Sequence, residues 1–357
     1  MRFHVVSLPH TQTTEAFSAC AYTEKVRKFA RMMHERGHEV VLYAGEENEA
    51  PCSEHVACIS EEERKSVVGA KHFTSASFDW SLPHWKRFNA RVSAEMKGRL
   101  GERDFICLIG GVAHKAIADA FPAHISVEFG IGYGGTFAKF RVFESYAWMH
   151  TIYGAQSGGD AHGIDGNFFD AVIPGYLEAE KFPFGAASER EDYFLFIGRL
   201  IERKGFSVAV EAAKAKGARL VIAGQGEPPE YGEYVGIVGP RERGELMRKA
   251  RAVFAPTIYI EPFGNVVPEA MACGTPVITT DWGAFTETVV DGVSGFRCRT
   301  LREFVSAMDK AEHVDHTGIR DYALSRFSLE AIAPKYEAYF ERLSTLWGRG
   351  WYEGVGE

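Results

Sequence analysis

Two glutamates separated by seven residues are the most informative feature of the sequence. Glu261 and Glu269 stand at the two ends of the segment EPFGNVVPE, whose pattern predicts a tight turn that opens a helix. Gly264 in this turn can adopt a backbone conformation that other residues avoid, and it lets a ligand approach the chain closely. The backbone N–H groups of residues 264–266 are expected to point out of the helix start, an arrangement that binds anions. Carboxylates beside such a site suit the hydroxyl groups of a sugar.

A second segment, FIGRLIERKG at residues 196–205, places two cations where a predicted strand gives way to a helix. Arg199 offers a bidentate guanidinium and Lys204 a compact ammonium, and both can neutralise a diphosphate. Two cations and a helix N-terminus together suit a leaving group that gains negative charge. The alternative is that the glutamates only stabilise a turn and a helix dipole, an effect of about 0.3–1 kcal/mol each. The combination of carboxylates and cations favours a ligand site.

Four segments follow one another in continuous order within residues 193–297: FIGRLIERKG, LVIAGQGE, VGIVGP and EPFGNVVPEAMACGTPVITTDWGAFTETVVDGVSGF. Together they resemble the C-terminal domain of retaining GT-B glycosyltransferases, specifically glycosyltransferase family 4 (glycosyl transferases group 1). The resemblance implies an α/β fold of GT-B architecture, with two Rossmann-like domains facing each other across a cleft. It further implies transfer of a hexose-type sugar from a nucleoside diphosphate sugar to a hydroxyl of a glycan, lipid or small molecule, with the anomeric configuration kept. Neither a cofactor nor a metal is expected, because the cations take the place of a metal.

The resemblance also assigns roles to the positions that match the family motifs. Glu261 is implied to contact the hydroxyls of the donor sugar, and Glu269 the ribose of the nucleotide. Arg199 and Lys204 are implied to hold the diphosphate, and with Glu261 they form the predicted catalytic set. The other implied donor-binding positions lie in turns and strand ends of the same domain: Gly198, Phe263, Gly264, Asn265, Val266, Ile237 and Val238. The last two are implied to border the base, and burial in the core is an equally open alternative for them.

The first half of the chain departs from the family pattern at two places. The family often has a glycine-rich loop after its first strand, whereas residues 9–14 here are PHTQTT. Many members also carry a histidine near the end of a later strand, but the matching residues 127–130 are VEFG. Glu128, His10 and His150 are candidates to replace that histidine, with a structural role favoured for each. The candidate set for the cleft or the acceptor also contains Thr11, Tyr133 and Gly134.

Two alternatives come from other classes of protein. Residues 130–135 are GIGYGG, which fits the G-x-G-x-x-G pattern of dinucleotide-binding folds. No clear strand ends in an acidic residue about 20 positions further on, as that motif requires. An NAD-dependent oxidoreductase is therefore the weaker alternative, and a loop facing the interdomain cleft is favoured. The missing histidine prompts the other alternative, a protein that binds a nucleotide sugar without turnover.

The order of predicted elements indicates two α/β units in series. In the first, strands are expected at residues 3–8, 38–44, 105–109, 124–129 and 171–174, with helices at 22–36, 80–100 and 140–153. In the second, strands are expected at residues 193–197, 219–223, 234–238, 252–255 and 276–280, with helices near 204–216, 241–251, 265–273 and after 301. The predicted domains are an acceptor-side domain at residues 1–178 and a donor-binding domain at 179–327. A last helix within residues 328–357 is expected to pack back on the first domain.

Composition narrows the class of protein. The chain has 357 residues, of which 46% are hydrophobic and 25% charged, and this profile is typical of a folded two-domain protein. A net charge of −8 argues against nonspecific binding of nucleic acid. No apolar stretch approaches the roughly 18–20 residues of a membrane span, and no secretory signal is recognised. We therefore expect a cytoplasmic protein.

Two smaller features leave a choice between a functional and an ordinary interpretation. The basic residues of the predicted helix at 22–36 fit a peripheral contact with a membrane surface, but a solvated helix face is favoured. Cys52 and Cys58 flank His55 without a second ligand pair at similar spacing. A loop with reduced thiols is favoured over a metal site there.

Overall fold

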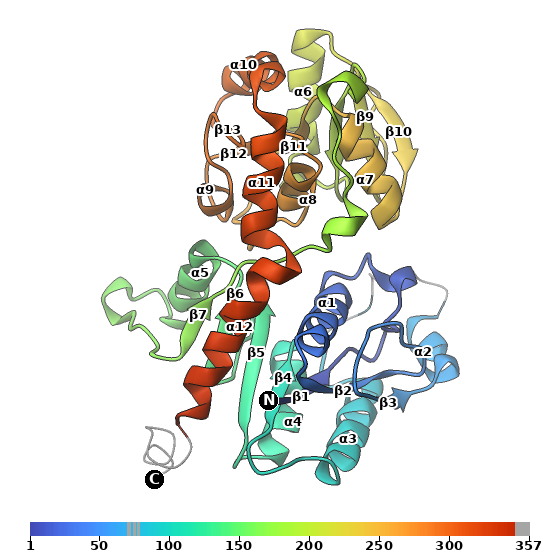
Figure 1. Cartoon of the computed structure of the whole chain (residues 1–357), viewed down its shortest axis with the longest axis vertical. Coiled ribbons are helices and arrows are strands. Elements are labelled where there is room, and N and C mark those ends of the chain that lie inside the picture. The colour runs from blue at the N-terminus through green and yellow to red at the C-terminus, as the bar shows by residue number, and fades with distance from the viewer. Residues whose placement is uncertain (70–72, 74–75, 77–78, 347–357) are drawn as a thin grey trace. The chain divides into compact units, whose positions relative to one another are not determined.

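The computed structural model describes residues 1–69, 73, 76 and 79–346. The chain divides into two compact units. The first consists of Met1–Phe143, Gly163–Ile173 and the chain from Ala333 onward, and the second of Glu144–His162 and Pro174–Ile332. Each unit is built around one parallel β-sheet with helices on both faces (Figure 1).

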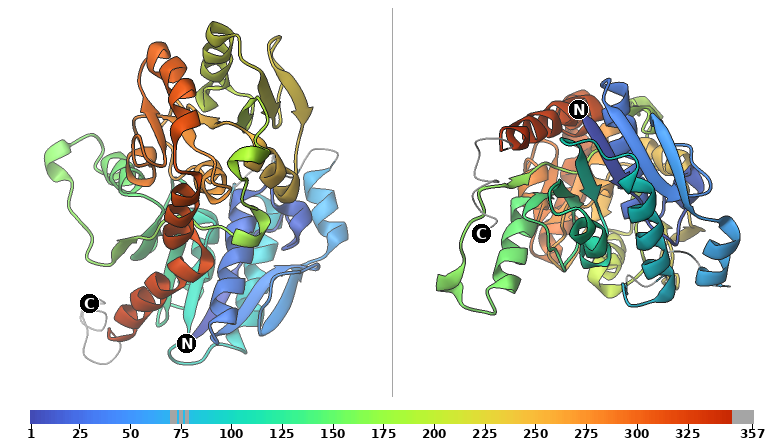
Figure 2. Two further views of the ribbon diagram at one scale, coloured as in Figure 1. Left: turned by 45° about the horizontal axis from the view of Figure 1, so that its top comes forward. Right: turned by 90° about the horizontal axis from the view of Figure 1, so that it is seen from below.

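The sheet of the first unit has seven parallel strands in the order β3-β2-β1-β4-β5-β6-β7. These strands are β1 (Arg2–Val6), β2 (Glu39–Gly45), β3 (Glu54–Ile59), β4 (Phe105–Leu108), β5 (Ile125–Ile131), β6 (Phe140–Phe143) and β7 (Asp170–Val172). Its helices are α1 (Ala21–Glu35), α2 (Glu61–Val68), α3 (Pro83–Lys97), α4 (Lys115–Ala120) and most of α12 (Leu329–Ser344). Figure 2 shows this sheet from two further sides.

Alternation along the strands gives the first sheet two apolar faces, because successive side chains of a strand point to opposite sides. On one face, Val6 of β1 and Ile106 of β4 belong to a core cluster that also includes residues of α3, among them Phe88. On the other face, the ring of Phe3 lies 4.7 Å from that of Phe340, on α12. The Phe105 ring lies 4.9 Å from the same Phe340 ring. Residues far apart in sequence therefore complete one core.

The sheet of the second unit has six parallel strands in the order β10-β9-β8-β11-β12-β13. They are β8 (Phe194–Ile197), β9 (Leu220–Ala223), β10 (Glu233–Gly236), β11 (Val253–Ala255), β12 (Val277–Thr280) and β13 (Gly295–Cys298). The helices of this unit are α5 (Tyr146–Gln156), α6 (Phe206–Lys216), α7 (Pro240–Lys249), α8 (Val266–Ala272), α9 (Phe285–Thr288), α10 (Leu301–Lys310) and α11 (His316–Phe327). This strand order is that of a doubly wound Rossmann-like fold.

The second sheet is likewise buried on both faces, with a separate core cluster on each. Leu195 of β8 packs in the cluster that contains residues of α7, α8 and α11. Its neighbours Phe194 and Phe196 pack in the other cluster, with residues of α6 and α10. Strands buried on both sides are expected to be almost continuously apolar, as the segment FLFI is. Such apolar runs explain why β8, β9, β11 and β12 could be predicted, whereas β13, with the sequence GFRC, was missed.

Several elements differ from those predicted. Residues 140–143 form the strand β6 rather than the start of a helix, and the helix α5 begins only at Tyr146. The reason is a helix N-cap, because Oγ of Ser145 accepts a hydrogen bond from the backbone N–H of Trp148 at 3.1 Å. The predicted loop between Cys52 and Cys58 contains the strand β3, which pairs with β2.

The chain segment Glu144–His162, which the sequence analysis places in the first domain, groups with the second unit. Its contacts explain why. The Ser145 hydroxyl donates a hydrogen bond of 2.6 Å to the carbonyl oxygen of Pro262. The backbone N–H groups of Tyr146 and Ala147 donate to the carboxylate of Glu287 at 2.9 and 2.8 Å. The start of α5 is thus held by two loops of the second unit.

Three observations concern membrane spans, cysteines and metal ligands. Within the described residues, no helix combines the length and the apolar character needed to cross a membrane. All six cysteines are free, and five of them are buried. Among the residues that the structure describes, no cluster of three or more potential ligands could hold a metal ion.

We predict that the protein loses stability in mild acid because burial strongly lowers the pKa of His10 and His114 in the first unit. Burial lowers the pKa of His10 to about 4 and that of His114 to about 3. The unfolded chain, with a pKa near 6.5 for each histidine, binds more protons below that value, so stability falls as the pH drops from about 6.5 to 4. The expected loss at pH 4.5 is about 2–3 kcal/mol for each histidine. Denaturant unfolding of the full chain across this range measures it.

His114→Asn is expected to flatten the pH dependence, even if the variant is less stable at pH 7.5. His150→Asn, at an exposed position of α5, is the matched control and keeps the dependence of the original chain. An unchanged slope in His114→Asn would contradict the prediction.

Candidate functional site

Two loops of the second unit meet where its strand order reverses. β8 and β11 are neighbours in the sheet, so the loops that follow them leave the same edge side by side. Ile258 of the later loop donates a backbone hydrogen bond of 2.9 Å to the carbonyl oxygen of Arg203 in the earlier one. Gly205 has a φ of +71°, and a Cβ at this position would collide with the carbonyl oxygen of Pro256. Glycine therefore permits the close approach of the two loops.

Lys204 and Glu261, predicted from separate motifs, form an ion pair where these loops meet. The Nζ atom of Lys204 lies 2.6 Å from Oε2 of Glu261. The Glu261 side chain is only 9% exposed and the Lys204 side chain 22%. A carboxylate removed from water is costly unless it is paired, so the ammonium compensates the burial of Glu261 and fixes its position.

Tyr259 is a third member of this group that the sequence analysis missed. Its hydroxyl donates a hydrogen bond of 2.8 Å to Oε1 of Glu261. The Nζ atom of Lys204 lies 5.1 Å from the centroid of the Tyr259 ring, and the guanidinium carbon of Arg203 lies 4.7 Å from it. Arg199 also lies near enough to lower the pKa of Tyr259, although burial, the larger effect, raises it. The available signal was its position two residues before Glu261, since alternate residues of an extended segment face the same side.

Glu269 has a cationic partner of its own, which the sequence analysis also missed. Nη2 of Arg243, on α7, lies 2.9 Å from Oε1 of Glu269, on α8. The Glu269 side chain is 10% exposed and the Arg243 side chain 25%. The guanidinium also lies over the ring of Phe182, at 5.8 Å from its centroid. Each glutamate of the motif is thus paired with a cation from an earlier element of the same unit.

The turn between the two glutamates has the glycine conformation that the sequence predicts. Gly264 has a φ of +79°, and a Cβ there would lie 2.8 Å from the ring of Phe285. The first backbone hydrogen bonds of the following helix are donated by Val267 to Gly264 and by Glu269 to Asn265. The N–H groups of residues 264–266 precede these bonds, at the position expected for contact with a ligand.

The side chains of the other predicted donor-binding residues differ in their exposure to solvent. Gly198 directly follows β8 and donates a backbone hydrogen bond of 3.0 Å to the carbonyl oxygen of Ala223, and Arg199 beside it is exposed. Phe263 is 2% exposed and packs in the core, so only its backbone is offered to a ligand. Ile237 directly follows β10 and is 61% exposed, while Val238 is half-buried. The core alternative for Ile237 is therefore wrong.

The candidate residues after the first strand of the first unit are buried. His10 is 1% exposed, and its ring lies 6.3 Å from that of Trp85. The hydroxyl of Thr11 shares a hydrogen bond of 2.6 Å with that of Thr23, on α1. Both residues make contacts that hold this loop to its own unit.

Glu128, the candidate on β5, is fully buried. Its carboxylate accepts hydrogen bonds from the backbone N–H groups of Phe137 and Ala138 at 2.9 and 2.8 Å, and from the hydroxyl of Tyr133 at 3.2 Å. Burial raises the pKa of Glu128, against the opposing effect of these hydrogen bonds. The carboxylate holds the loop 132–138, in which Gly134 is exposed. His150 is exposed on α5, in the second unit.

The glycine pattern at residues 130–135 does not open a helix. Gly130 lies within β5, and its carbonyl oxygen accepts a hydrogen bond of 2.8 Å from Nζ of Lys25. The chain then runs through a loop directly into β6. A dinucleotide-binding motif places the start of a helix at the phosphates, and this segment has none.

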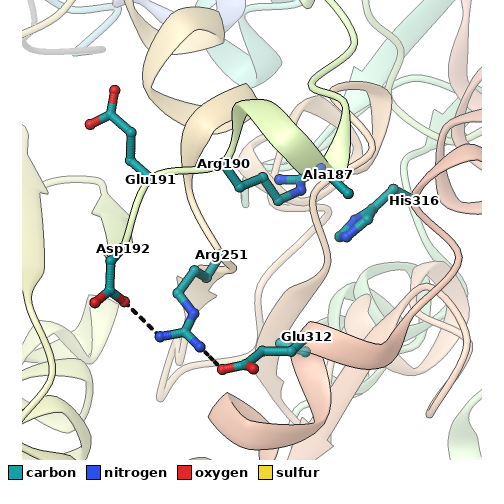
Figure 3. A pocket seen from close by; sticks show the side chains of 8 residues that line it. Ala187, Arg190, Glu191, Asp192, Arg251, Glu312 and His316 are labelled. Carbon is teal, nitrogen blue, oxygen red and sulfur yellow. Dashed lines mark hydrogen bonds and ion pairs between the residues drawn. The ribbon is translucent and has the colours of Figure 1, made fainter.

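A pocket of about 410 Å³ lies in the second unit (Figure 3). Its lining residues include Asp192 and Arg251, each two residues before a strand and so at the opposite edge of the sheet from the two glutamates, and Glu312. Arg251 lies between the other two and forms an ion pair with each. Ligands of parallel sheets bind at the carboxyl ends of the strands, so we interpret this cluster as structural.

Part of the second unit matches a known protein family. Residues 191–312 match the family model described as Glycosyl transferases group 1. Glycogen synthase of Mycobacterium tuberculosis is 32% identical over 147 residues, which cover 36% of this chain and 35% of that protein. D-inositol 3-phosphate glycosyltransferase of Mycolicibacterium smegmatis is 33% identical over 151 residues, which cover 37% and 34%. The chain thus spans about a third of the length of the curated relatives that it matches.

Solved structures resemble the chain over almost its whole length. Sucrose-phosphate synthase from Thermosynechococcus elongatus has a TM-score of 0.73 at 15% identity, covering 97% of this chain and 99% of its own. Anabaena HepE, in complex with UDP and glucose, has a TM-score of 0.65 at 16% identity, covering 97% and 100%. The chain therefore has the two-domain GT-B fold, with a Rossmann-like sheet in each unit.

We predict that Arg243→Leu destabilises the protein because it leaves the Glu269 carboxylate buried without this cation. The expected loss is about 1–3 kcal/mol in the free energy of unfolding. Arg248→Leu, on the same helix, is the control, since Arg248 pairs with two exposed glutamates and a loss below about 1 kcal/mol is expected. Urea unfolding of the full chain measures both. The double variant Arg243→Leu/Glu269→Gln is expected to recover part of the loss, and no recovery would contradict the argument.

Proposed function

We propose that this protein is a glycosyltransferase that moves a hexose-type sugar from a nucleoside diphosphate sugar to a hydroxyl group of an acceptor. The observation that carries the proposal is the arrangement around Glu261 and Glu269. Each carboxylate is paired with a cation at the carboxyl edge of the second sheet, within the region that matches Glycosyl transferases group 1. The UDP and UDP-glucose complexes of Anabaena HepE support a nucleoside diphosphate as the donor's leaving group.

The positive charge of the site suits a departing diphosphate. An ammonium has three N–H donors, so Lys204 can keep one on Glu261 and turn the others toward a phosphate oxygen. Arg199 is exposed beside it and adds a bidentate donor. The charge on the diphosphate grows as the glycosidic bond breaks, so these cations stabilise the transition state more than the bound donor. We propose on this basis that the reaction needs no metal and no further cofactor.

We assign the two glutamates to different parts of the donor. Glu261 lies beside Lys204 and is proposed to accept hydrogen bonds from hydroxyls of the transferred sugar. Glu269, on α8 beyond the turn, is proposed to hold the ribose, and exposed Ile237 to border the base. Retention of the anomeric configuration is part of the proposal through the resemblance to family 4. Proton NMR of the product's anomeric coupling tests it.

Two alternatives are less well supported. The segment at residues 130–135 opens no helix, which removes the observation that suggested an NAD-dependent oxidoreductase. A binder without turnover rests on the missing histidine, for which buried Glu128 and His10 are no substitutes. The matched relatives, glycogen synthase and D-inositol 3-phosphate glycosyltransferase, favour turnover instead.

A panel of nucleotides tests the donor class. UDP, GDP and ADP, their glucose conjugates, and NAD are compared in thermal unfolding of the full chain. A ligand at 100 times its dissociation constant adds about 2.7 kcal/mol to the stability of the folded state. We expect stabilisation by one nucleoside diphosphate and its sugar conjugate, with none by NAD, and slow release of free sugar from that conjugate. Stabilisation by NAD alone would refute the proposal, and binding without any sugar release would favour the inert binder.

We predict that Lys204→Gln lowers kcat and kcat/KM together, by about 10²–10³-fold, because it removes charge needed in the transition state. Glutamine can still donate a hydrogen bond to Glu261, so the burial of the carboxylate stays compensated. Lys214→Gln, on α6 at an exposed position, is the control and should keep the original rate. A rise in KM at constant kcat would show that Lys204 only binds the donor.

A further inference from the structure

We propose that Tyr259 is a positioning residue that sets the geometry of both Glu261 and Lys204 for sugar transfer. The inference rests on the proposed function, in which the carboxylate contacts the sugar and the ammonium the departing diphosphate. Neither the E-x7-E spacing nor the cation motif includes Tyr259. Its role is inferred from its contacts with both partners of the ion pair.

The two oxygens of the Glu261 carboxylate have different partners. Oε1 accepts the hydrogen bond of the Tyr259 hydroxyl at 2.8 Å, and Oε2 that of the Lys204 ammonium at 2.6 Å. The terminal torsion of a glutamate is broad, so one partner alone leaves the carboxylate plane free to turn. Two partners on different oxygens fix this plane. The remaining lone pairs of the carboxylate then have defined directions toward a sugar hydroxyl.

The ring of Tyr259 makes a cation–π contact with Lys204, the other member of the ion pair. Nζ of Lys204 lies 5.1 Å from the ring centroid, and the guanidinium carbon of Arg203 lies 4.7 Å from it. A cation within about 6 Å of an aromatic face is attracted by the ring quadrupole. The flexible lysine side chain is thereby restrained at the edge where the diphosphate is proposed to bind.

Tyr259 also keeps the site assembled when the donor arrives. A diphosphate draws the Lys204 ammonium toward itself and weakens its hold on Oε2. The hydroxyl on Oε1 carries no charge and has no such competitor, so it retains the carboxylate. Burial and the neighbouring Glu261 raise the pKa of Tyr259, which keeps the hydroxyl protonated as a donor.

Tyr259→Phe separates the two contributions, because phenylalanine keeps the ring under the cations and removes only the hydroxyl. We expect kcat to fall at least tenfold, while the Kd of the nucleoside diphosphate changes less than twofold. The preference of the protein for the nucleotide sugar over the nucleoside diphosphate should shrink, since only the sugar meets Glu261. UDP-glucose and UDP are the first probes, measured by calorimetry and by sugar transfer or release.

Tyr231→Phe is the matched control. Its hydroxyl donates a hydrogen bond of 2.7 Å to the carbonyl oxygen of Ala218 in the same unit, at the opposite edge of the sheet. This variant loses one hydroxyl as well and should retain both kcat and the nucleotide preference. Tyr259→Leu, which also removes the ring, should in addition weaken UDP binding through Lys204.

Two kinds of result would overturn the inference. An unchanged kcat in Tyr259→Phe, or equal weakening of UDP and UDP-glucose binding, would leave Tyr259 with a merely structural role. Failure of the original chain to bind any nucleotide sugar would instead overturn the proposed function. A crystal structure of Tyr259→Phe decides the positioning role without any ligand. A turned Glu261 carboxylate supports it, and an unmoved one contradicts it.

Discussion

The burial of the Glu261 carboxylate is the constraint on which the second unit depends. A carboxylate with 9% of its side chain exposed needs compensation inside the protein, and the sources available are the Lys204 ammonium and the Tyr259 hydroxyl. Lys204 can reach it because Gly205 lets the two loops at the strand-order reversal touch. The strand order places the two loops side by side, Gly205 lets them touch, and this contact brings Lys204 to Glu261.

The same constraint explains how the second unit accommodates a polar site beside a tightly packed sheet. Both faces of β8 are apolar and buried, so this strand offers no polar side chain to a ligand. The polar groups that could contact a ligand therefore lie in the loops and helix starts at the carboxyl edge of the sheet. There the charged groups appear as matched pairs, Lys204 with Glu261 and Arg243 with Glu269. An incoming ligand meets groups that are already oriented by each other.

The sequence predicts most elements of the second unit because most of its strands are short apolar runs and its motifs are local. It misses β13, α9 and α11. The turn at Gly264 could be inferred from residue types alone, and so could the cations near β8. The pairing of Lys204 with Glu261 could not, because it joins positions 57 residues apart through the strand order. Arg243 is 26 residues from Glu269, and nothing local marks it. In the first half, residues 140–153 were predicted as one helix because of their aromatic and apolar content. This prediction missed the strand β6 and the N-cap at Ser145.

The aromatic cluster of the first unit has a consequence for biosynthesis. Phe340 packs against Phe3 and Phe105, so β1 and β4 complete this part of their core only with a helix that follows the second unit in the sequence. The second unit, by contrast, contains its own sheet and both of its core clusters within Pro174–Ile332. Domains usually fold in the order of synthesis. The position of α12 in the sequence predicts the opposite order here, with the first sheet completing its core after the second unit.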